Sequence, residues 1–383
     1  MRLLVATPYL FPQGGGLERY ARSISAHLAA AGHEVAEIGH ATARFERVEG
    51  GARQVGVLPR ARLSNTPLSL RYHSEARRLL RETRPHVVVV HTPVPGAAEL
   101  AALAARQARV PYVVTYHAGR LAAPKGSPLA LAAWAHRAGP ERALLSGAAA
   151  RIAVSEYVAD RVFGHRACTI VPPGVDAERF APGPPPVPGR ILYVGPVDRA
   201  YEWKGFETLF QAFARLARDL PEARLRVVGQ GDLVDRYQWR ARAQGLQERV
   251  SFAGRVKEDD LPREYQRADV VVLPSLSDAE SFGMVLAEAN ACGRPVVGSR
   301  MGGIPTFVRH GDNGLLAPPG DAAALEEAIR RVLEDPKMGA AMGQRGRARV
   351  LAEHRWDDLA KRTERVLAEA IAASGRAPRR TPP

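Results

Sequence analysis

The chain of 383 residues contains only two cysteines, Cys168 and Cys292, which lie far apart in the sequence. Neither belongs to a C-x-x-C or similar metal-binding spacing, and so few cysteines exclude a disulfide-rich secreted domain. We therefore expect a reduced, cytoplasmic protein with two structural thiols.

Long apolar runs are missing as well. The most apolar stretch, residues 87–105, is interrupted by a histidine, two prolines and a glutamate, which argues against a membrane-spanning helix. The opening residues 1–7 are too short for the core of a signal peptide and run into Pro8. The sequence thus predicts neither a membrane span nor a targeting signal.

The charge is strongly basic and unevenly distributed. Residues 1–180 carry 23 Lys and Arg against 13 Asp and Glu, a net charge of +10, whereas the remaining residues carry 31 against 27. This excess indicates an anionic partner for the first half. Aromatic residues make up only 6% of the chain, and no zinc-finger or RNP signature is present, so nucleic acid is not the expected partner. We favour peripheral contact with an anionic membrane at the inner face of the plasma membrane, where each basic side chain contributes about 1 kcal/mol. Residues 129–143, with Arg137 and Arg142, are a candidate for this contact, although a buried helix is the simpler interpretation.

Short β-branched runs alternate with longer amphipathic stretches through the first half. Strands that alternate with helices predict a parallel sheet covered on both faces. The expected strands are residues 3–6, 34–38, 87–91, 112–116, 152–155 and 169–171, and the expected helices are 17–31, 68–82, 129–146 and 156–162.

A proline-rich segment, residues 181–189, cannot continue a helix or a strand, and we interpret it as a linker between two domains. Beyond it the alternation starts again. Two such halves predict ligands at the carboxyl ends of the strands. The expected strands are 191–194, 225–228, 250–253, 270–273 and 295–298, and the expected helices are 204–218, 233–244, 264–268, 284–291 and 322–334.

Two glutamates, Glu280 and Glu288, enclose the sequence Ser-Phe-Gly-Met-Val-Leu-Ala. If the stretch from Phe282 is helical, eight steps place the carboxylates about 12 Å apart along the axis and within a quarter turn of one face. The free amides of Phe282, Gly283 and Met284 would then point toward an anionic group. A nucleotide sugar, with hydroxyls at both ends and phosphates in the middle, fits this arrangement.

This segment resembles the E-x7-E motif of the group 1 retaining nucleotide-sugar glycosyltransferases, and the resemblance extends over nearly the whole chain. It implies the GT-B architecture, an α/β fold with two doubly wound, Rossmann-like domains that face each other across a cleft. Residues 1–180 would bind the acceptor and 190–354 the nucleotide sugar. A helix at 355–374 would return to the first domain, and 375–383 would form a disordered tail.

The resemblance also assigns residues in the first domain. In the family, a glycine-rich loop after the first strand faces the donor phosphates and the acceptor, and Gly15 and Gly16 match it. Glycines there let the backbone approach a ligand closely. A histidine at a strand end touches the donor hexose in the family. His117 is its match here, and His91 is a weaker candidate of the same kind.

The second domain opens with Gly195, Arg199 and Lys204. A cationic pair after a strand suits a diphosphate. The family commonly has arginine directly after the glycine, but Pro196 stands there, so Arg199 is our substitute for it. Gly254 ends a strand whose backbone reads the edge of the base in the family.

The resemblance implies that Glu288 binds the ribose hydroxyls and that Glu280 holds hydroxyls of the transferred sugar. Arg199, Lys204 and the helix start would neutralise the departing diphosphate. The sequence has no D-x-D at a strand end and no His/Asp cluster with metal spacing. We therefore expect no metal and no cofactor beyond the nucleotide sugar, with retention of configuration by same-face attack that the leaving phosphate assists.

The donor is expected to be a UDP- or GDP-linked hexose, and the acceptor a hydroxyl of a glycan, a lipid-linked or a small molecule. Such an enzyme would serve polysaccharide, glycolipid or glycoconjugate synthesis. Two other classes stay open: a different enzyme on the same architecture, such as a nucleotide-sugar epimerase, and a basic nucleic-acid-binding protein.

Overall fold

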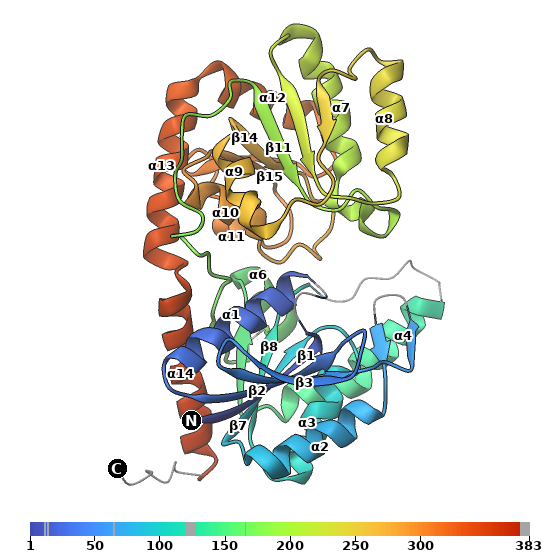
Figure 1. The fold of residues 1–383 in the computed structure, drawn as a ribbon, viewed down its shortest axis with the longest axis vertical. Coiled ribbons are helices and arrows are strands. Elements are labelled where there is room, and N and C mark those ends of the chain that lie inside the picture. The colour runs from blue at the N-terminus through green and yellow to red at the C-terminus, as the bar shows by residue number, and fades with distance from the viewer. Residues whose placement is uncertain (11–12, 14, 64–65, 120–127, 165, 376–383) are drawn as a thin grey trace. The chain divides into compact units, whose positions relative to one another are not determined.

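The computed structural model describes residues 1–10, 13, 15–63, 66–119, 128–164 and 166–375. The chain divides into two compact units (Figure 1). Unit 1 consists of Met1–Pro173 and Trp356–Pro383, and unit 2 of Gly174–Arg355. Each unit has a largely parallel sheet flanked by helices, so the predicted α/β class with two doubly wound units is confirmed.

Among its described residues, unit 1 contains an eight-stranded sheet with the order β10-β9-β8-β7-β1-β2-β4-β3. All neighbours are parallel except the edge strand β3, which runs antiparallel to β4. β7 is buried at every position because a parallel sheet is covered on both faces. The strands are β1 (Arg2–Tyr9), β2 (Glu34–His40), β3 (Phe45–Glu49), β4 (Ala52–Val57), β7 (Val87–Thr92), β8 (Tyr112–Tyr116), β9 (Ala150–Ala153) and β10 (Thr169–Ile170), with a separate hairpin of β5 (Ala61–Leu63) and β6 (Thr66–Leu68).

Helices cover both faces of this sheet. From β1 the chain continues to β2 on one side of β1 in the sheet, and from β4 it returns to β7 and then β8 on the other side. Because these crossovers are right-handed, α1 lies on one face of the sheet and α2 and α3 lie on the other (Figure 1). α14 packs beside α1, and α3 beside α2. The helices are α1 (Gly16–Ala30), α2 (Arg71–Thr83), α3 (Ala97–Gln107), α4 (Pro128–His136), α5 (Arg142–Ser146), α6 (Glu156–Val158) and α14 (Trp356–Ala373).

The last helix, α14, belongs to unit 1 although it follows unit 2 in the sequence. Leu359, Leu367 and Ile371 on one stripe of the helix are buried in the core of unit 1. Arg362 donates a hydrogen bond to the backbone oxygen of Ile170 at 2.7 Å. The predicted return of the C-terminal helix to the first unit is therefore confirmed.

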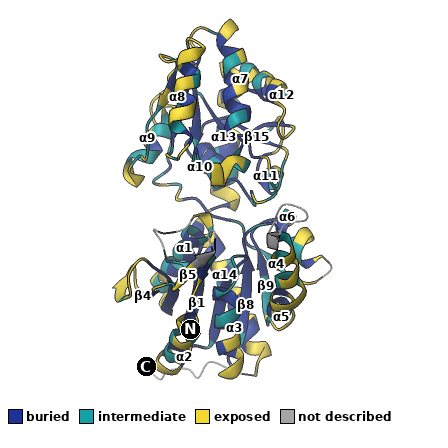
Figure 2. Ribbon diagram, turned by 90° about the vertical axis from the view of Figure 1, so that its right-hand side faces the viewer, coloured by how far each residue is buried: buried dark blue, intermediate teal, exposed yellow. Residues whose placement is uncertain are grey.

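Unit 2, in which every residue is described, has a six-stranded parallel sheet with the order β13-β12-β11-β14-β15-β16. Side chains alternate between its two faces, so Ile191 and Tyr193 enter one core and Leu192 another. Figure 2 shows most strands of each unit as buried and the outer helix faces as exposed, whereas the edge strand β3 is largely exposed. The strands are β11 (Arg190–Val194), β12 (Arg224–Val228), β13 (Val250–Phe252), β14 (Val270–Leu273), β15 (Val296–Ser299) and β16 (Gly314–Ala317).

The helices of unit 2 contribute to the same two hydrophobic cores. α7 packs against α12 on one face, and α10 packs against α13 and α9 on the other. A short 3-10 helix at Arg199–Lys204 precedes α7. The helices are α7 (Phe206–Asp219), α8 (Val234–Ala243), α9 (Leu261–Gln266), α10 (Met284–Ala291), α11 (Ile304–Phe307), α12 (Ala322–Glu334) and α13 (Pro336–Glu353).

The structure differs from the sequence prediction in several elements. The units divide after Pro173, earlier than the expected boundary at residue 180. The proline-rich segment 181–189 lies within unit 2, where the amide of Val187 donates to the Arg267 carbonyl at 3.0 Å. β3, β4, α3 and α13 were not predicted. The expected helix 129–146 is interrupted by a π-helical turn at Arg137–Glu141, which contains Pro140 and so lacks one backbone donor. Residues 376–383 of the expected tail lie outside the described residues.

Candidate functional site

Glycines lie just beyond the carboxyl ends of three neighbouring strands of unit 2. Gly195 follows β11, Gly229 follows β12, and Gly254 lies just beyond β13. The Gly229 amide donates to the Gly254 carbonyl at 2.9 Å, and a Cβ on Gly229 would lie 1.8 Å from the Gly195 oxygen. These carboxyl ends are thus bare backbone, which a ligand can approach closely. Gly229 was not predicted as a site residue; its signal is the Gly-Gln-Gly sequence directly after the strand.

The structure brings Lys204 and Glu280 together. Lys204 Nζ lies 2.6 Å from Glu280 Oε2, and the Ser275 hydroxyl donates to the same carboxylate oxygen at 3.1 Å. The Glu280 residue is only 8% exposed. Lys204 Nζ also lies 4.5 Å from the centre of the Trp203 ring, a favourable cation–π distance. A buried carboxylate and a cation from segments 76 residues apart therefore form one polar centre.

Two glycines support the loop that carries Glu280. The Gly303 amide donates to the Glu280 carbonyl at 2.8 Å, and a Cβ on Gly303 would lie 1.7 Å from the Ser281 oxygen. A Cβ on Gly302 would lie 2.1 Å from the Glu280 oxygen. Larger residues would therefore displace this loop. The Thr306 hydroxyl donates to the Gly303 carbonyl at 2.6 Å.

Helix α10 extends over Met284–Ala291, which confirms the expected helix 284–291, but it does not reach back to Phe282. Gly283 precedes it with a φ of +86°, a left-handed conformation that favours glycine and stops the helix from extending toward Glu280. Glu280 therefore lies in the preceding loop, and the separation of about 12 Å expected for a continuous helix does not apply. The Phe282 side chain is buried against the rings of Phe307 and His354.

Glu288 lies in the second turn of α10 and is buried. Its Oε2 accepts a hydrogen bond from the Tyr265 hydroxyl of α9 at 2.6 Å. Cys292 follows at the end of the helix, and burial raises the pKa of its thiol to about 12, with the Glu288 charge adding to the effect. Tyr265 was not predicted as part of the site.

Arg199 is placed differently from Lys204. Its guanidinium is 76% exposed and lies 3.6 Å from the Asp232 carboxylate, and its backbone amide also donates to Asp232. Lys204, at the other end of the same 3-10 helix, turns toward Glu280. The structure thus joins Lys204 to Glu280, whereas Arg199 is paired with Asp232.

In unit 1, the glycine-rich loop after β1 leads into α1, which begins at Gly16. The Gly15 amide donates to the Glu18 carboxylate at 2.7 Å. Burial raises the pKa of Glu18, while hydrogen bonds from backbone amides partly offset this effect. Glu18, which was not predicted, therefore fixes the entry into α1. Gly14 lies outside the described residues.

His117 follows β8, and its ring forms a hydrogen bond with His91 at the end of β7. The His91 Nδ1 and His117 Nε2 atoms are 2.8 Å apart, and both residues are buried. The two histidines predicted from strand ends are therefore in contact, as parallel neighbours at the carboxyl edge of the sheet.

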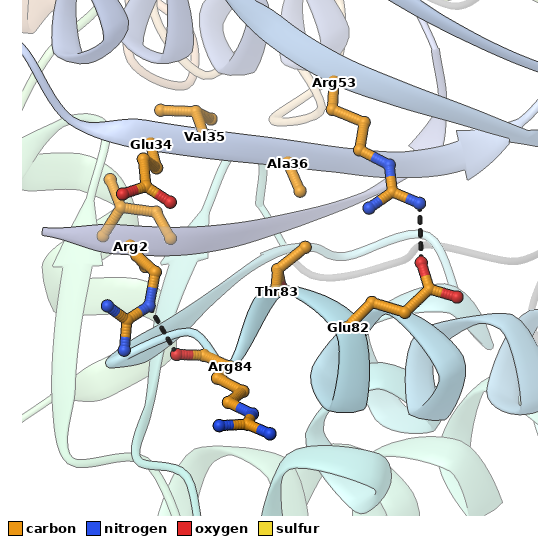
Figure 3. A pocket seen from close by; sticks show the side chains of 9 residues that line it. Arg2, Glu34, Val35, Ala36, Arg53, Glu82, Thr83 and Arg84 are labelled. Carbon is orange, nitrogen blue, oxygen red and sulfur yellow. Dashed lines mark hydrogen bonds and ion pairs between the residues drawn. The ribbon is translucent and has the colours of Figure 1, made fainter.

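A hollow of about 600 Å³ lies at the opposite, amino-terminal ends of the strands of this sheet (Figure 3). Arg2 and Glu34, which line it, are the first residues of β1 and β2. Arg53 pairs with Glu82 at 2.6 Å, and Arg2 donates to the Arg84 carbonyl at 3.0 Å. Ligand sites of parallel sheets lie at the carboxyl ends of strands, so we assign this hollow no part in the site.

The described residues contain neither a metal-binding cluster nor a membrane-spanning helix. Within the described ranges, no group of three or more His, Cys, Asp or Glu side chains is placed to hold a metal ion. In the same part of the chain, no helix has the length and apolar character needed to cross a membrane.

Comparison with known sequences identifies the family. The profile described as Glycosyl transferases group 1 matches residues 175–349, and the profile of Glycosyltransferase Family 4 matches residues 14–179. Together the two matches extend over both units. The chain belongs to the group 1 glycosyltransferases and has their GT-B fold.

The chain is similar to particular members of this family. It is 34% identical over 231 residues to the GDP-mannose-dependent alpha-(1-6)-phosphatidylinositol monomannoside mannosyltransferase of Mycolicibacterium smegmatis, a match that covers 56% of this chain and 60% of that protein. The match therefore spans only about three fifths of the relative's length. It is 28% identical to the phosphatidyl-myo-inositol mannosyltransferase of Mycobacterium leprae over 98% of both chains.

Among solved structures, the chain resembles sucrose-phosphate synthase from Thermosynechococcus elongatus. The TM-score is 0.78 and the identity 25%, and the match covers 97% of this chain and 99% of the other. This agreement extends across both units and supports the GT-B fold.

Proposed function

We propose that the protein is a retaining glycosyltransferase that moves a hexose from a UDP- or GDP-linked donor to an acceptor hydroxyl. The observation that carries this proposal is the Lys204–Glu280 pair beside the strand ends of unit 2. A cation for the diphosphate and a carboxylate for sugar hydroxyls are the groups that such a donor requires. The names of the mannosyltransferase relatives favour GDP and a lipid-linked acceptor.

In this proposal, unit 2 binds the donor. Glu288 binds the ribose hydroxyls, and the backbone at Gly254 contacts the base. The diphosphate lies at Gly195 and the start of α10, where free amides and the helix dipole favour an anion. Glu280 holds hydroxyls of the hexose and positions its anomeric carbon.

The transfer breaks the bond between the anomeric carbon and the phosphate oxygen and forms the bond to the acceptor oxygen on the same face of the sugar. Lys204, with Arg199 as a second cation, stabilises the negative charge that develops on the diphosphate. The leaving phosphate takes the proton of the acceptor hydroxyl. On the basis of the family resemblance, we also propose that Gly15 and Gly16 contact the donor phosphates and that His117 contacts the hexose. Lys204 and Arg199 neutralise the leaving diphosphate without a metal ion. A chelator is therefore expected to leave transfer unchanged.

The first test is a thermal-shift titration with GDP, UDP and ADP. A nucleotide at 100 times its dissociation constant stabilises the state that binds it by about 2.7 kcal/mol. For a unit of this size, the expected rise in Tm is roughly 5–10 °C. We expect one of the three nucleotides to give this shift and Glu288→Gln to abolish it.

Two controls make the result specific. Tyr265→Phe removes the hydroxyl that contacts Glu288 but keeps the carboxylate, so it should retain a clear shift. Glu326→Gln changes a carboxylate on α12 and should not alter binding. A folded protein that responds to none of the nucleotides contradicts the proposal. Conversion of the donor sugar without any acceptor would instead support an epimerase.

We further propose that α4 contacts an anionic membrane that carries the acceptor. Leu131 and Trp134 on this helix are 67% and 60% exposed, which corrects the expectation of a buried helix. Arg137 and the exposed Arg142 follow them on the same helical segment. Apolar side chains next to arginines suit the interface of an acidic bilayer.

Liposome co-sedimentation with and without phosphatidylserine tests this surface. We expect binding that requires the anionic lipid and that Trp134→Ala reduces several-fold. The Arg137→Glu/Arg142→Glu double variant should reduce it about thirtyfold or more, since each lost arginine contributes about 1 kcal/mol. The matched controls lie in unit 2: Trp239→Ala, at a tryptophan that is 68% exposed, and Arg215→Glu/Arg218→Glu on α7. Equal losses in both sets would show nonspecific binding and contradict the role of α4.

A further inference from the structure

The two histidines of unit 1 form a connected pair because of the strand register. His91 of β7 lies opposite Thr115 of β8, and the amide of His117 donates to the Thr92 carbonyl at 3.0 Å. Since paired residues of parallel strands share a face and side chains alternate, His117 projects on the same face as His91. Their ring centres are 5.0 Å apart, and Nδ1 of His91 lies 2.8 Å from Nε2 of His117.

The surroundings fix both rings. Tyr20 of α1 packs edge-on against His117, with ring centres 4.8 Å apart, and also lies 6.1 Å from His91. The Tyr20 hydroxyl donates to the Val171 carbonyl at 3.1 Å, and its ring contacts Trp356 of α14. The histidine pair is therefore enclosed by side chains that are themselves anchored.

Both rings are neutral at physiological pH. Burial lowers the pKa of His91 to about 3, and burial together with the neighbouring His91 lowers the pKa of His117. A hydrogen bond between two neutral imidazoles needs one N–H and one lone pair. If His91 Nδ1 carries the proton, His117 must carry its own on Nδ1, and in the opposite case Nδ1 of His117 is an acceptor. The tautomer of His91 thus determines whether Nδ1 of His117 donates or accepts a hydrogen bond.

We propose that His91 is a positioning residue that holds His117 in one orientation and one tautomer, so that His117 Nδ1 contacts a hydroxyl of the transferred sugar in a single defined role. Among the described residues, no side chain or backbone group hydrogen-bonds to this nitrogen. The inference rests on the proposed function, because it takes the hexose as the ligand of His117. It adds His91, which contacts the sugar only through its neighbour.

NMR with isotope-labelled histidine tests the tautomer directly, since the chemical shifts of the two ring nitrogens report which one carries the proton. In the unmodified protein at neutral pH, we expect His117 to show one protonated and one unprotonated nitrogen. His91→Phe keeps a ring of similar size but removes the hydrogen bond, so the His117 nitrogens should average between tautomers. Unchanged His117 shifts in His91→Phe would overturn the proposal.

Binding provides a second readout that a packing defect would not produce. We expect His91→Phe to weaken the nucleotide sugar about tenfold, the factor for roughly 1.4 kcal/mol, and to leave the nucleoside diphosphate unaffected. His91→Asn, whose side-chain amide reaches the position of Nδ1, should restore part of the loss. His91→Phe combined with His117→Ala should be no weaker than His117→Ala alone, as for residues that act through one contact.

The control is His73→Phe, which removes a half-buried imidazole of α2 that bonds to the Leu100 carbonyl. It should change neither the His117 shifts nor the preference for the sugar-bearing donor. Equal loss of nucleotide and nucleotide sugar in His91→Phe would reduce His91 to a structural residue and overturn the inference. Absence of nucleotide binding in the unmodified protein would contradict the proposed function instead, so the two failures are distinguishable.

Discussion

Several ionisable side chains of unit 1 are buried, and their protonation is coupled to folding. His91 and His117 are buried in the neutral form, whereas Glu18 and Glu37 are carboxyls whose pKa burial raises. As the pH falls, the histidines and the carboxyls change the free energy of unfolding in opposite directions. The histidines resist protonation in the folded state, while the carboxyls accept protons more readily when folded.

The histidine pair should make unit 1 less stable in mild acid. Above pH about 6.5 both the folded and unfolded states hold neutral histidines, and the full stability is present. Below that value the unfolded chain binds protons that the folded pair excludes, so stability falls by up to about 1.4 kcal/mol per pH unit for each histidine. The loss continues toward the folded pKa, which is about 3 for His91.

Urea unfolding of the unmodified protein and of His91→Phe at two pH values tests this prediction. Because the raised pKa values of Glu18 and Glu37 are common to both proteins, their contribution cancels in the comparison. Between pH 7 and pH 5 the unmodified protein should lose about 2 kcal/mol more than the variant. The same pH dependence in both proteins would show that His91 is not held neutral by the fold.

At the scale of elements, α13 is a helix that its sequence disfavours. It contains Gly339, Gly343 and Gly346, and glycine costs about 1 kcal/mol relative to alanine in a helix interior. A Cβ on Gly343 would lie 2.1 Å from the Gly293 oxygen, and one on Gly346 would lie 2.3 Å from the Asn290 side chain. The glycines therefore let α13 pack closely on the end of α10, and this contact offsets their low helix propensity.

Gly343→Ala separates propensity from packing. Propensity alone predicts that alanine stabilises α13 by about 1 kcal/mol. The close approach to Gly293 predicts a net loss of about 1–3 kcal/mol instead, since the added methyl group has no space. Chemical denaturation measures the difference. Gln344→Ala, at the exposed neighbouring position, should change stability by less than about 0.5 kcal/mol. A more stable Gly343→Ala variant would contradict the packing argument.

At the scale of the whole molecule, the chain crosses twice between units. Unit 1 takes its last helix, α14, from beyond unit 2, and each unit has its own hydrophobic core. A substitution in α14 should therefore affect the unit that contains the N-terminus rather than the unit that precedes α14 in sequence.

Leu367→Ala tests this assignment. Leu367 is fully buried in unit 1, and its truncation should cost about 2–5 kcal/mol. Calorimetry should show a lower Tm for the unfolding of unit 1. The Tm of the nucleotide-binding unit, which added nucleotide raises, should stay unchanged. Leu351→Ala, at a partly exposed position of α13, is the control and should have a small effect. A lowered transition of the nucleotide-binding unit would contradict the assignment of α14.

The sequence predicted several residues of the candidate site but not the contacts between them. The Glu280 and Glu288 motif, Lys204 and the two strand-end histidines could be named because short motifs and element ends are local features. The contact of Lys204 with Glu280 and the pairing of Glu288 with Tyr265 could not be predicted, since each joins segments separated by many residues. Arg199, chosen by analogy, pairs with Asp232, a partner that only the folded loop places beside it.

By itself, the sequence determined the alternation of strands and helices, the presence of two such halves and the family to which the chain belongs. These properties follow from hydrophobic periodicity and from local motifs, which operate over a few residues. Only the tertiary structure decided that the proline-rich segment packs within unit 2, that a glycine-rich stretch forms α13, and that His91 and His117 form a pair. The physical reason is that each of these depends on contacts between distant segments, whose free energy outweighs the local preference of the chain.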